Sequence, residues 1–451
     1  MVREGKKKAG RERRSSPKGS RDDSRDHAPV DDAIELKEIG DERPLQVVNR
    51  RDFVQEGITF LALAGLAGIS LRALKPPTTG PDPTLHPLEG PPSPIPGDSA
   101  SGPSPAGTPV PGLQEASFYV QAAGGKVACD LCPHGCVLSP GQRGICRVRE
   151  NHDGRLYTHG YGNPCSIHID PIEKKPLLHF LPTTTAFSIA IGGCNFRCLN
   201  CQNWEISQRT PEEVEQGELT PAEVAELAKR DGCASVAYTY SEPSAWYEYM
   251  LDSGTATRAL GMRNVWVTNG YLNQRPLKEL CKVLDGANVD LKAFSEKMYS
   301  ELCSGTLRPV KDTIVTLREQ GVWVEVATLL VPGYTDDMDL LRDMCTWLVK
   351  ALGPDVPHHI SRFHPDYKLT HLPWTPMKAL KEAREIARDA GEHYVYVGNV
   401  APSSDIPDPE TTYCPSCGQA VIERTGFVVT KFDLEGGSCP KCGESIAGVW
   451  A

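Results

Sequence analysis

The chain has 451 residues, of which 24% are charged and 39% hydrophobic, so it is long enough for one large folded domain with additional segments. Its formal net charge of -10 gives no general basic surface, which argues against a nucleic-acid partner. The 16 cysteines mostly stand in groups at short spacing, which is typical of metal ligation and not of a disulfide framework.

The N-terminal region carries two segments of different composition. Residues 1–48 are rich in charged residues and serine, and we expect them to be disordered because they cannot bury a core. In segment 49–74, the twin arginine Arg50 and Arg51 precedes an apolar run at 58–71, which resembles a Tat export signal. That run is shorter than the ~20 residues of a spanning helix, so a signal or shallow membrane anchor is expected, with a buried helix as the alternative. A membrane-associated or exported protein is therefore predicted, and a cytoplasmic one is the alternative.

A linker and a first group of cysteines follow. Residues 75–116 are dense in Pro, Gly, Ser and Thr, which is typical of an extended tether between a domain and a membrane. The next segment, 117–180, contains a C-x2-C-x3-C-x9-C pattern. Four thiolates complete either a structural zinc site or a second iron-sulfur cluster, and the spacing does not decide between them. The four residues are Cys129, Cys132, Cys136 and Cys146.

A second group of cysteines, Cys194-Asn-Phe-Arg-Cys198-Leu-Asn-Cys201, comes directly after a short apolar run. Cysteine thiolates are the usual ligands of iron-sulfur clusters, so this loop can hold three irons of a four-iron cluster. The fourth iron stays open to an outside ligand, which a catalytic cluster requires and a pure electron carrier avoids. A structural zinc site or three reduced buried thiols are the alternatives.

This loop, with Gln202 and Asn203 after it, resembles the cluster loop of radical S-adenosylmethionine (SAM) enzymes of the pyruvate formate-lyase activating type. From about residue 117 to its end, the chain is similar to the radical SAM member of the AmmeMemoRadiSam system, whose members accompany Memo-like and AMMECR-like proteins. The resemblance implies a [4Fe-4S] cluster, SAM, an external electron donor and these two candidate partners. Asn200 departs from the pattern, since many such loops carry an aromatic residue there.

Strand-like runs alternate with helical patterns in segment 181–400, which predicts an α/β fold of parallel βα units. Six or so units fit the partial (β/α)6 barrel that the resemblance implies. The expected strands are Phe187–Ile191, Ala234–Tyr240, Asn264–Thr268, Ala287–Leu291, Trp323–Leu330, His359–Phe363 and His393–Val397. The expected helices are Pro221–Lys229, Pro276–Leu284, Val310–Gln320, Met338–Ala351 and Pro376–Ala390.

Polar residues stand at the carboxyl ends of the second and third expected strands, where βα barrels collect their chemistry. By the resemblance, Ser241 and Glu242 meet the amino group of SAM, and Glu242 can neutralise it by a charge-assisted hydrogen bond. Thr268 and Asn269 match the segment that meets the ribose or methionyl group. A helix N-cap at Ser241 and a plain Asn-Gly turn at Asn269 are the alternatives.

Further candidates follow the fourth and sixth expected strands. Asp290 and Lys292 resemble the Asp-x-Lys of the activases, and their spacing on a strand turns both side chains to one face. A surface ion pair is the alternative for them. His364 is a candidate for binding substrate or SAM, with a plain loop histidine as the alternative.

Segment 401–451 contains two C-x2-C knuckles separated by residues with hairpin character. This arrangement predicts a zinc ribbon, and rubredoxin-like iron is the alternative. The four expected ligands are Cys414, Cys417, Cys439 and Cys442.

The sequence thus predicts an enzyme that cleaves SAM reductively and passes the resulting 5′-deoxyadenosyl radical to an unidentified substrate by hydrogen abstraction. The alternative is a non-catalytic, membrane-tethered iron-sulfur electron carrier. A carrier does not need Glu242, Asn269 and Asp290 at successive strand ends, which weakens that alternative. The export signal conflicts with the cytoplasmic origin of SAM, and the sequence does not resolve this conflict.

Overall fold

The computed structural model describes residues 113–451. The predictions for segments 1–48 and 49–74 and for most of the linker lie outside the described residues. Within the described range, no helix combines the length and the apolar character needed to cross a membrane.

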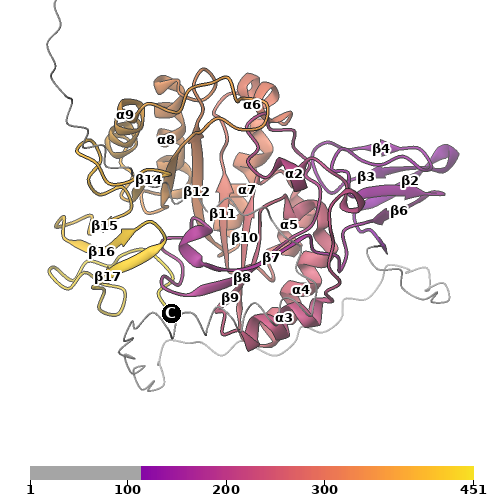
Figure 1. The fold of residues 1–451 in the computed structure, drawn as a ribbon, viewed down its shortest axis with the longest axis horizontal. Coiled ribbons are helices and arrows are strands. Elements are labelled where there is room, and N and C mark those ends of the chain that lie inside the picture. Colours follow the sequence, from indigo (N-terminus) through magenta and orange to yellow (C-terminus); the bar gives the residue numbers. More distant parts are fainter. Residues whose placement is uncertain (1–112) are drawn as a thin grey trace, which may run out of the picture. The chain divides into compact units, whose positions relative to one another are not determined.

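One eight-stranded sheet forms the centre of the described part, with the strand order β14-β13-β12-β11-β10-β9-β8-β7 (Figure 1). Every neighbouring pair from β8 to β14 is parallel, and β7 runs antiparallel to β8 at the edge. The predicted central parallel sheet is therefore confirmed, while its closure into a partial barrel stays a prediction. The strands are β7 (Ser166–Pro171), β8 (Thr185–Ala190), β9 (Ser235–Tyr238), β10 (Arg263–Thr268), β11 (Gly286–Asp290), β12 (Trp323–Leu330), β13 (His358–Arg362) and β14 (Val395–Gly398).

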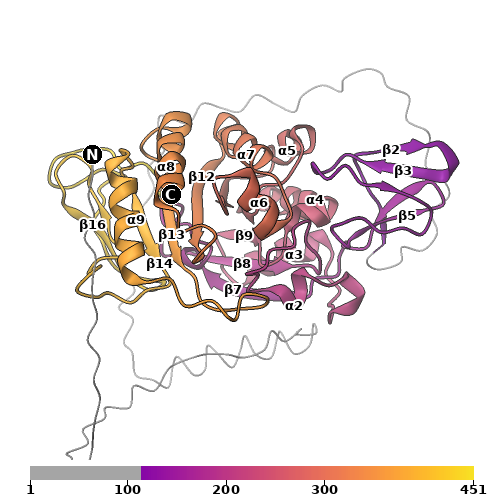
Figure 2. The ribbon, with the colours of Figure 1, turned by 90° about the horizontal axis from the view of Figure 1, so that it is seen from above.

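Helices connect the parallel strands and pack along one face of the sheet (Figure 2). The five expected helices are present as α3, α5, α7, α8 and α9, with ends that differ by up to four residues. The α-helices are α2 (Trp204–Ser207), α3 (Pro221–Arg230), α4 (Tyr247–Ala259), α5 (Gln274–Leu280), α6 (Glu296–Cys303), α7 (Leu307–Glu319), α8 (Met338–Leu352) and α9 (Met377–Asp389). The short 3-10 helices are η1 (Ala123–Gly125), η2 (Ile172–Lys174), η3 (Pro211–Glu213) and η4 (Pro243–Trp246).

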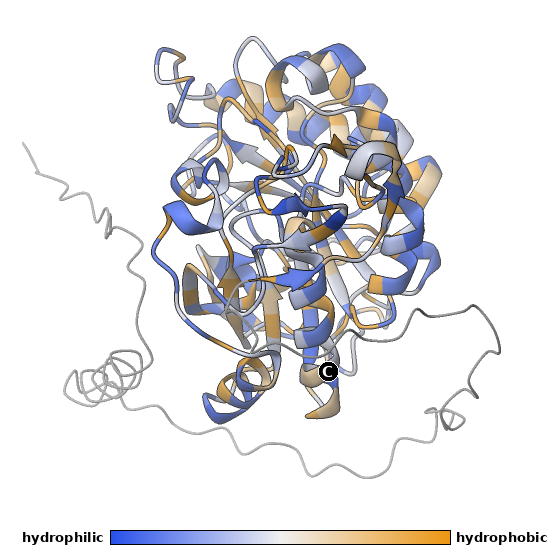
Figure 3. Cartoon of the chain, turned by 90° about the vertical axis from the view of Figure 1, so that its right-hand side faces the viewer, coloured by the Kyte–Doolittle hydropathy of each residue, from blue (hydrophilic) through white to orange (hydrophobic). Residues whose placement is uncertain are grey.

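The hydrophobic pattern explains which elements could be predicted. Strand β9 is buried along its whole length, as expected for a parallel strand covered on both faces. Most helices alternate hydrophobic and hydrophilic residues around their circumference (Figure 3), which is the signal of an amphipathic helix. Helix α4 also buries polar residues such as Glu248, Ser253 and Thr257, so its apolar stripe is interrupted and the sequence did not reveal it.

Two small sheets precede the central sheet. One contains β1 (Gln114–Glu115), β6 (Arg155–Thr158) and β5 (Arg149–His152), and the other contains β2 (Tyr119–Ala122), β3 (Lys126–Cys129) and β4 (Val137–Leu138). A buried ion pair between Arg149 and Glu248 joins these strands to helix α4. The Ser117 backbone N–H also donates to the Glu248 carboxylate at 2.7 Å, so a single carboxylate holds two strand segments.

The C-terminal segment forms an antiparallel sheet of β15 (Thr412–Tyr413), β16 (Ala420–Thr425) and β17 (Val428–Phe432). Its hairpin lies between the two cysteine knuckles, where the sequence indicates one. The sheet packs on Leu178, Tyr394 and Tyr396. Arg424 donates to the Leu178 carbonyl at 2.7 Å and to Thr412 Oγ1 at 2.9 Å, so this sheet is tied to the chain segment before β8.

Glu325 on β12 is a fully buried carboxylate that holds several segments together. It accepts from the backbone N–H groups of Leu178 (3.0 Å) and His179 (2.8 Å), and it pairs with His359 Nε2 at 2.6 Å. Burial opposes the ionised form, but the hydrogen bond and charge of His359 prevail and hold the Glu325 pKa below its ordinary value. The charged form is therefore part of the native structure.

We expect Glu325→Ala to lower the free energy of unfolding by about 3–5 kcal/mol, because it leaves buried donors without an acceptor. The matched control is Glu423→Ala, whose side chain is 46% exposed and which should cost less than about 1 kcal/mol. Because the native pKa is lowered, the wild-type contribution of Glu325 is present above the unfolded carboxyl pKa and is lost as the pH falls through the native pKa. Denaturant unfolding of both variants at neutral and acidic pH checks this, and equal losses in the two variants would contradict it.

Candidate functional site

The three loop cysteines lie between β8 and α2. The loop is fastened to the end of α6, because the N–H groups of Arg197 and Leu199 donate to the carbonyls of Cys303 and Leu302, each at 2.9 Å. The Phe196 N–H points at Cys194 Sγ at 3.3 Å. Two backbone hydrogen bonds therefore fix the loop to the end of α6, and an N–H group within the loop points toward a candidate ligand sulfur.

The spacing of the three thiols separates the candidate metals. Among residues 113–451, the sets of three or more Cys, His, Asp or Glu ligand atoms within 4.8 Å of one another do not include Cys194, Cys198 and Cys201. A zinc ion with Zn–S bonds of about 2.3 Å draws its thiolates to about 3.8 Å from one another. The donor set and its wider spacing therefore fit a multi-iron cluster better than a single zinc ion.

Cys303, which carries no motif, contacts the middle cysteine of the loop. The hydrogen bond from the Cys303 thiol is the largest influence on Cys198 and lowers its pKa; burial opposes this, and the positive charge of Lys292 adds to the lowering. Both neighbours therefore favour a thiolate at Cys198. No sequence motif marks Cys303, since it stands about a hundred residues after the loop in helix α6.

Glu242 is buried beside the ends of β9 and β10. Its Oε1 accepts from Thr268 Oγ1 at 2.8 Å and from the Ser244 N–H at 3.0 Å, and its Oε2 accepts from the Asn269 N–H at 2.8 Å. It also caps η4, whereas Ser241 Oγ donates to the Ile191 carbonyl at 2.6 Å; the helix cap is thus at Glu242 and not at Ser241. Burial raises the pKa of Glu242 above its ordinary value, although these donors oppose the rise.

Asn269 connects that carboxylate to the cysteine loop. Its Nδ2 donates to Asn195 Oδ1 at 2.7 Å and lies 3.9 Å from Cys194 Sγ, while its Oδ1 accepts from the Tyr271 N–H at 2.9 Å. The following Gly270 has φ +68°, and a Cβ there would lie 2.9 Å from Val289, so the turn requires glycine. The structure therefore brings Glu242, Thr268 and Asn269 together with the first loop cysteine.

The other expected residues lie at neighbouring strand ends. Asp290 ends β11, and its Oδ2 is 2.7 Å from Lys292 Nζ, so the two side chains form an ion pair at the end of the strand. His364 lies after β13, with Nδ1 3.4 Å from Gln202 Nε2 in the cysteine loop. Its side chain is 35% exposed. The structure thus places His364 next to the loop through one hydrogen bond.

A buried group that the sequence did not indicate surrounds the side chain of Tyr240, two residues before Glu242. Tyr240 adopts φ +62°, and its carbonyl accepts from Asn203 Nδ2 at 2.9 Å, just beyond the cysteine loop. Its hydroxyl hydrogen-bonds Asp170, which also pairs with Lys175. Burial lowers the Lys175 pKa to about 8, against the opposing effect of Asp170. Asp170 and Lys175 stand in no recognisable motif, and only the fold brings them to Tyr240.

The four N-terminal cysteines surround a single cavity of about 20 Å³, which Arg149 and Asn195 also line. The cysteines themselves are Cys129, Cys132, Cys136 and Cys146. The structure therefore brings the expected set together around a space next to the loop that contains Cys194.

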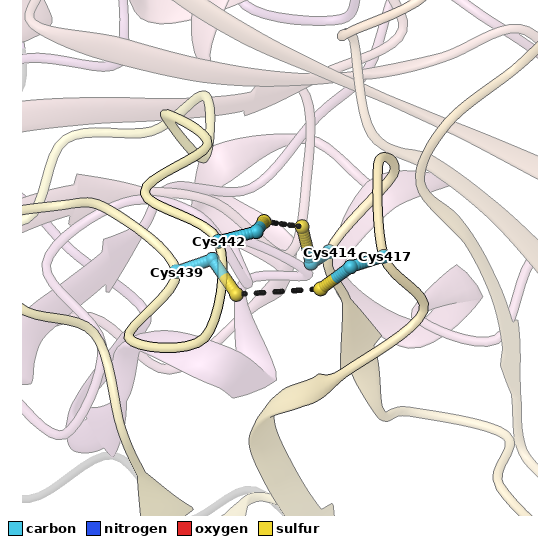
Figure 4. A group of neighbouring side chains, drawn as sticks. All are labelled: Cys414, Cys417, Cys439 and Cys442. Carbon is cyan, nitrogen blue, oxygen red and sulfur yellow. Dashed lines mark hydrogen bonds between the residues drawn. The ribbon is translucent and has the colours of Figure 1, made fainter.

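The four C-terminal cysteines lie close together and point toward one another (Figure 4). Cys414 Sγ lies 3.5 Å from Cys442 Sγ, and Cys417 Sγ lies 3.7 Å from Cys439 Sγ. These distances match the spacing of about 3.8 Å expected around one tetrahedral metal ion. Sets without a recognised motif also occur in the described range, at Glu150/His152/His159 and at Cys345/His358/Glu392.

The comparisons with known proteins agree with this site. The model of the radical SAM superfamily matches residues 188–344, which include the cysteine loop and the ends of β9, β10 and β11. The chain is 47% identical over 336 residues to Uncharacterized protein MJ0808 of Methanocaldococcus jannaschii, and the match covers 74% of this chain and 99% of that protein.

Two solved structures match part of the chain at low sequence identity. A domain of pyruvate-formate lyase-activating enzyme from Bacteroides vulgatus is 14% identical, with 36% of this chain and 98% of that chain covered and a TM-score of 0.33. Streptococcus suis SuiB bound to S-adenosylmethionine is also 14% identical, with 54% and 56% covered and a TM-score of 0.38. The family model matches the region that contains the cysteine loop, and a relative is 47% identical to this chain over 99% of its own length. The chain therefore belongs to the radical SAM superfamily.

Proposed function

We propose that this chain is a radical SAM enzyme whose three loop cysteines, Cys194, Cys198 and Cys201, hold a [4Fe-4S] cluster with SAM on its open iron. Membership of the superfamily implies the cluster, SAM and an electron donor. When bound, the cluster supplies the electron that splits SAM into methionine and a 5′-deoxyadenosyl radical, which takes a hydrogen atom from the substrate. The observation that carries the proposal is the link from Glu242 through Asn269 to Cys194.

Glu242 is suited to receive the ammonium group of SAM. It is 2% exposed, and no basic side chain among residues 113–451 forms an ion pair with it. A buried carboxylate without a cation has a raised pKa, and an incoming ammonium would remove that penalty through a charge-assisted hydrogen bond. Thr268 and the Asn269 N–H hold the carboxylate in one orientation, so little reorganisation is needed on binding.

The remaining polar residues complete the proposed SAM pocket. Ser241 fixes the segment before Glu242 on the Ile191 carbonyl, next to the cysteine loop. Asp290 and Lys292 present a charged pair at the following strand end, and His364 reaches the loop through Gln202. We assign these residues to SAM or substrate contacts, in line with the arrangement of chemistry at the carboxyl ends of βα strands.

The substrate class and the partners belong to this proposal as well. The motifs quoted from the sequence support an activase-like enzyme of the AmmeMemoRadiSam system, with Memo-like and AMMECR-like proteins as partners. Neither the fold nor the comparisons favour the alternative of a non-catalytic electron carrier, because the described strand ends hold a carboxylate and amides around the first loop cysteine. A membrane tether through segment 49–74 remains a prediction from the sequence alone.

We further assign zinc to the C-terminal cysteines. The spacing of their sulfurs supports one tetrahedral ion, and the ligands connect two loops of the small C-terminal sheet. Cys414 and Cys439 are buried in the same cluster as Tyr394 and Tyr396. The ion would therefore stabilise the contact between this sheet and β14.

The central test is the formation of 5′-deoxyadenosine. After anaerobic reconstitution with iron and sulfide, the wild-type chain with SAM and a strong reductant should release it, whereas Cys198→Ala should reduce the rate at least about a thousandfold because an incomplete ligand set cannot hold the cluster. Cys281→Ala removes a buried cysteine outside the loop and should keep the activity. No product from the wild type with an intact cluster, or full activity of Cys198→Ala, would contradict the proposed function.

Glu242→Gln should weaken SAM binding about 10- to 100-fold, since it replaces a charge-assisted hydrogen bond by a neutral one. The matched control is Glu279→Gln at an exposed position of α5, which should leave the affinity unchanged. Anaerobic titration calorimetry of the reconstituted proteins measures both. Equal affinities for the two variants would remove Glu242 from the SAM site.

Metal analysis tests the zinc assignment. We expect about one zinc ion per chain at the C-terminal cysteines, and its loss together with a lower unfolding temperature in Cys417→Ala. Cys233→Ala, another buried cysteine, should keep the zinc. Iron in place of zinc at this site, or an unchanged metal content in Cys417→Ala, would argue against the assignment.

A further inference from the structure

The two four-cysteine groups of the chain differ in the spacing of their sulfurs. The C-terminal sulfurs stand 3.5 and 3.7 Å apart in pairs, and all four lie within 4.8 Å of one another. Within the described range, no three of the N-terminal sulfurs meet that 4.8 Å limit, although all four cysteines line one cavity. The C-terminal sulfurs are therefore spaced as expected around a single metal ion, whereas the N-terminal sulfurs lie farther apart.

The cavity itself is too large for a zinc site. Thiolates at about 2.3 Å from a zinc ion leave no room for a water-sized sphere between them. Here the cavity that the four cysteines line together with eight other residues has a volume of about 20 Å³, more than the roughly 10–15 Å³ that one water requires. Gly144 also lines this space, and a Cβ at that position would make ordinary contacts at 3.8 Å with both Cys136 Sγ and Cys146 Sγ.

One buried basic residue, Arg149, is among the residues that line the cavity. Arg149 is 1% exposed, and two of its nitrogens are used by the Ser117 carbonyl and the Glu248 carboxylate. Its Nε–H is buried and has no hydrogen-bond partner in the part of the chain that the structure describes. A buried donor without a partner is costly, and the sulfurs of a negatively charged cluster are acceptors that it lacks otherwise. Leu131, Leu138 and other apolar residues also line the cavity.

We infer that Cys129, Cys132, Cys136 and Cys146 hold a second [4Fe-4S] cluster and not zinc. Four cysteine thiolates are the full ligand set of such a cluster, so no iron stays open and the site is not a second SAM site. The cluster lies next to the catalytic loop: Asn195 lines its cavity and follows Cys194 in the chain, and His134 Nε2 bonds the Asn195 carbonyl at 2.8 Å.

The test uses the full chain in which the three cysteines of the catalytic loop are replaced by alanine. In Cys194→Ala/Cys198→Ala/Cys201→Ala, reconstituted anaerobically with iron and sulfide, we expect about half of the wild-type iron and sulfide and the EPR signal of a reduced four-iron cluster. A triple variant without iron and with one zinc ion more than the C-terminal site accounts for would overturn the inference.

The reverse variant, Cys132→Ala/Cys136→Ala, keeps the catalytic loop and should also lose about half of the iron. If the triple variant keeps all of the wild-type iron and the reverse variant keeps none, the N-terminal cluster is supported and the catalytic cluster of the proposed function fails. If the triple variant loses all iron and the reverse variant loses none, the catalytic cluster is supported and the N-terminal cluster is contradicted. The two conclusions are therefore separable.

The role of Arg149 has its own readout. In the triple-variant background, Arg149→Lys keeps a positive charge near Glu248 but removes the Nε–H. We expect the cluster to form and its reduction potential to fall, because hydrogen bonds to the sulfurs raise the potential. An unchanged potential would show that Arg149 does not donate to the cluster, and loss of iron uptake would show that it is needed to form the site.

Discussion

The hydrogen bonds of a single carboxylate, Glu242, determine where the reactive part of this molecule lies. The parallel strands β9 and β10 end near this point, and the two oxygens of the same group accept from Thr268 at the end of β10, from the Asn269 N–H after it and from the Ser244 N–H of η4. Asn269 then reaches Cys194 and Asn195 in the loop after the preceding strand. The ends of β8, β9 and β10 are thus held in one arrangement, with the carboxyl group of Glu242 at a defined place beside the loop. A shift of either strand would separate the carboxylate from the sulfur.

The same type of interaction recurs where separate parts of the chain meet. Glu248 on α4 binds both Arg149 and the Ser117 N–H of the N-terminal strands, and Glu325 on β12 binds His359 together with two backbone N–H groups before β8. Each is a buried carboxylate surrounded by several donors. Such groups contribute orientation more than net stability, since their burial opposes the charge that they carry. The N-terminal cysteines and the segment before β8 are therefore positioned by charge and not by apolar packing alone.

The sequence was informative where one local rule decides the structure. The parallel strands were predictable because each is a short buried apolar run, and the cysteine groups because their ligands are close in sequence. Strand β7 was missed because Ser166–Pro171 mixes apolar and polar residues and pairs antiparallel. The contacts of Cys303 with Cys198, and of Tyr240 with Asp170, join residues far apart in the chain, and no spacing rule reports on them. The wide spacing of the N-terminal sulfurs could not be predicted from the sequence either. The sequence therefore did not decide between zinc and an iron-sulfur cluster at these cysteines.

Asn195 belongs to both cysteine sites. Its side chain hydrogen-bonds Asn269 near the cysteine loop, its backbone carbonyl hydrogen-bonds His134, and the residue also lines the N-terminal cavity. In the proposed assignment, a metal group that orders Asn195 at one site would also order part of the other site, so the entropy cost of loading the second site would be lower. By thermodynamic reciprocity the second then strengthens the first by the same factor. Asn195 therefore couples the two proposed sites: each could load on its own, and loading of one would favour loading of the other.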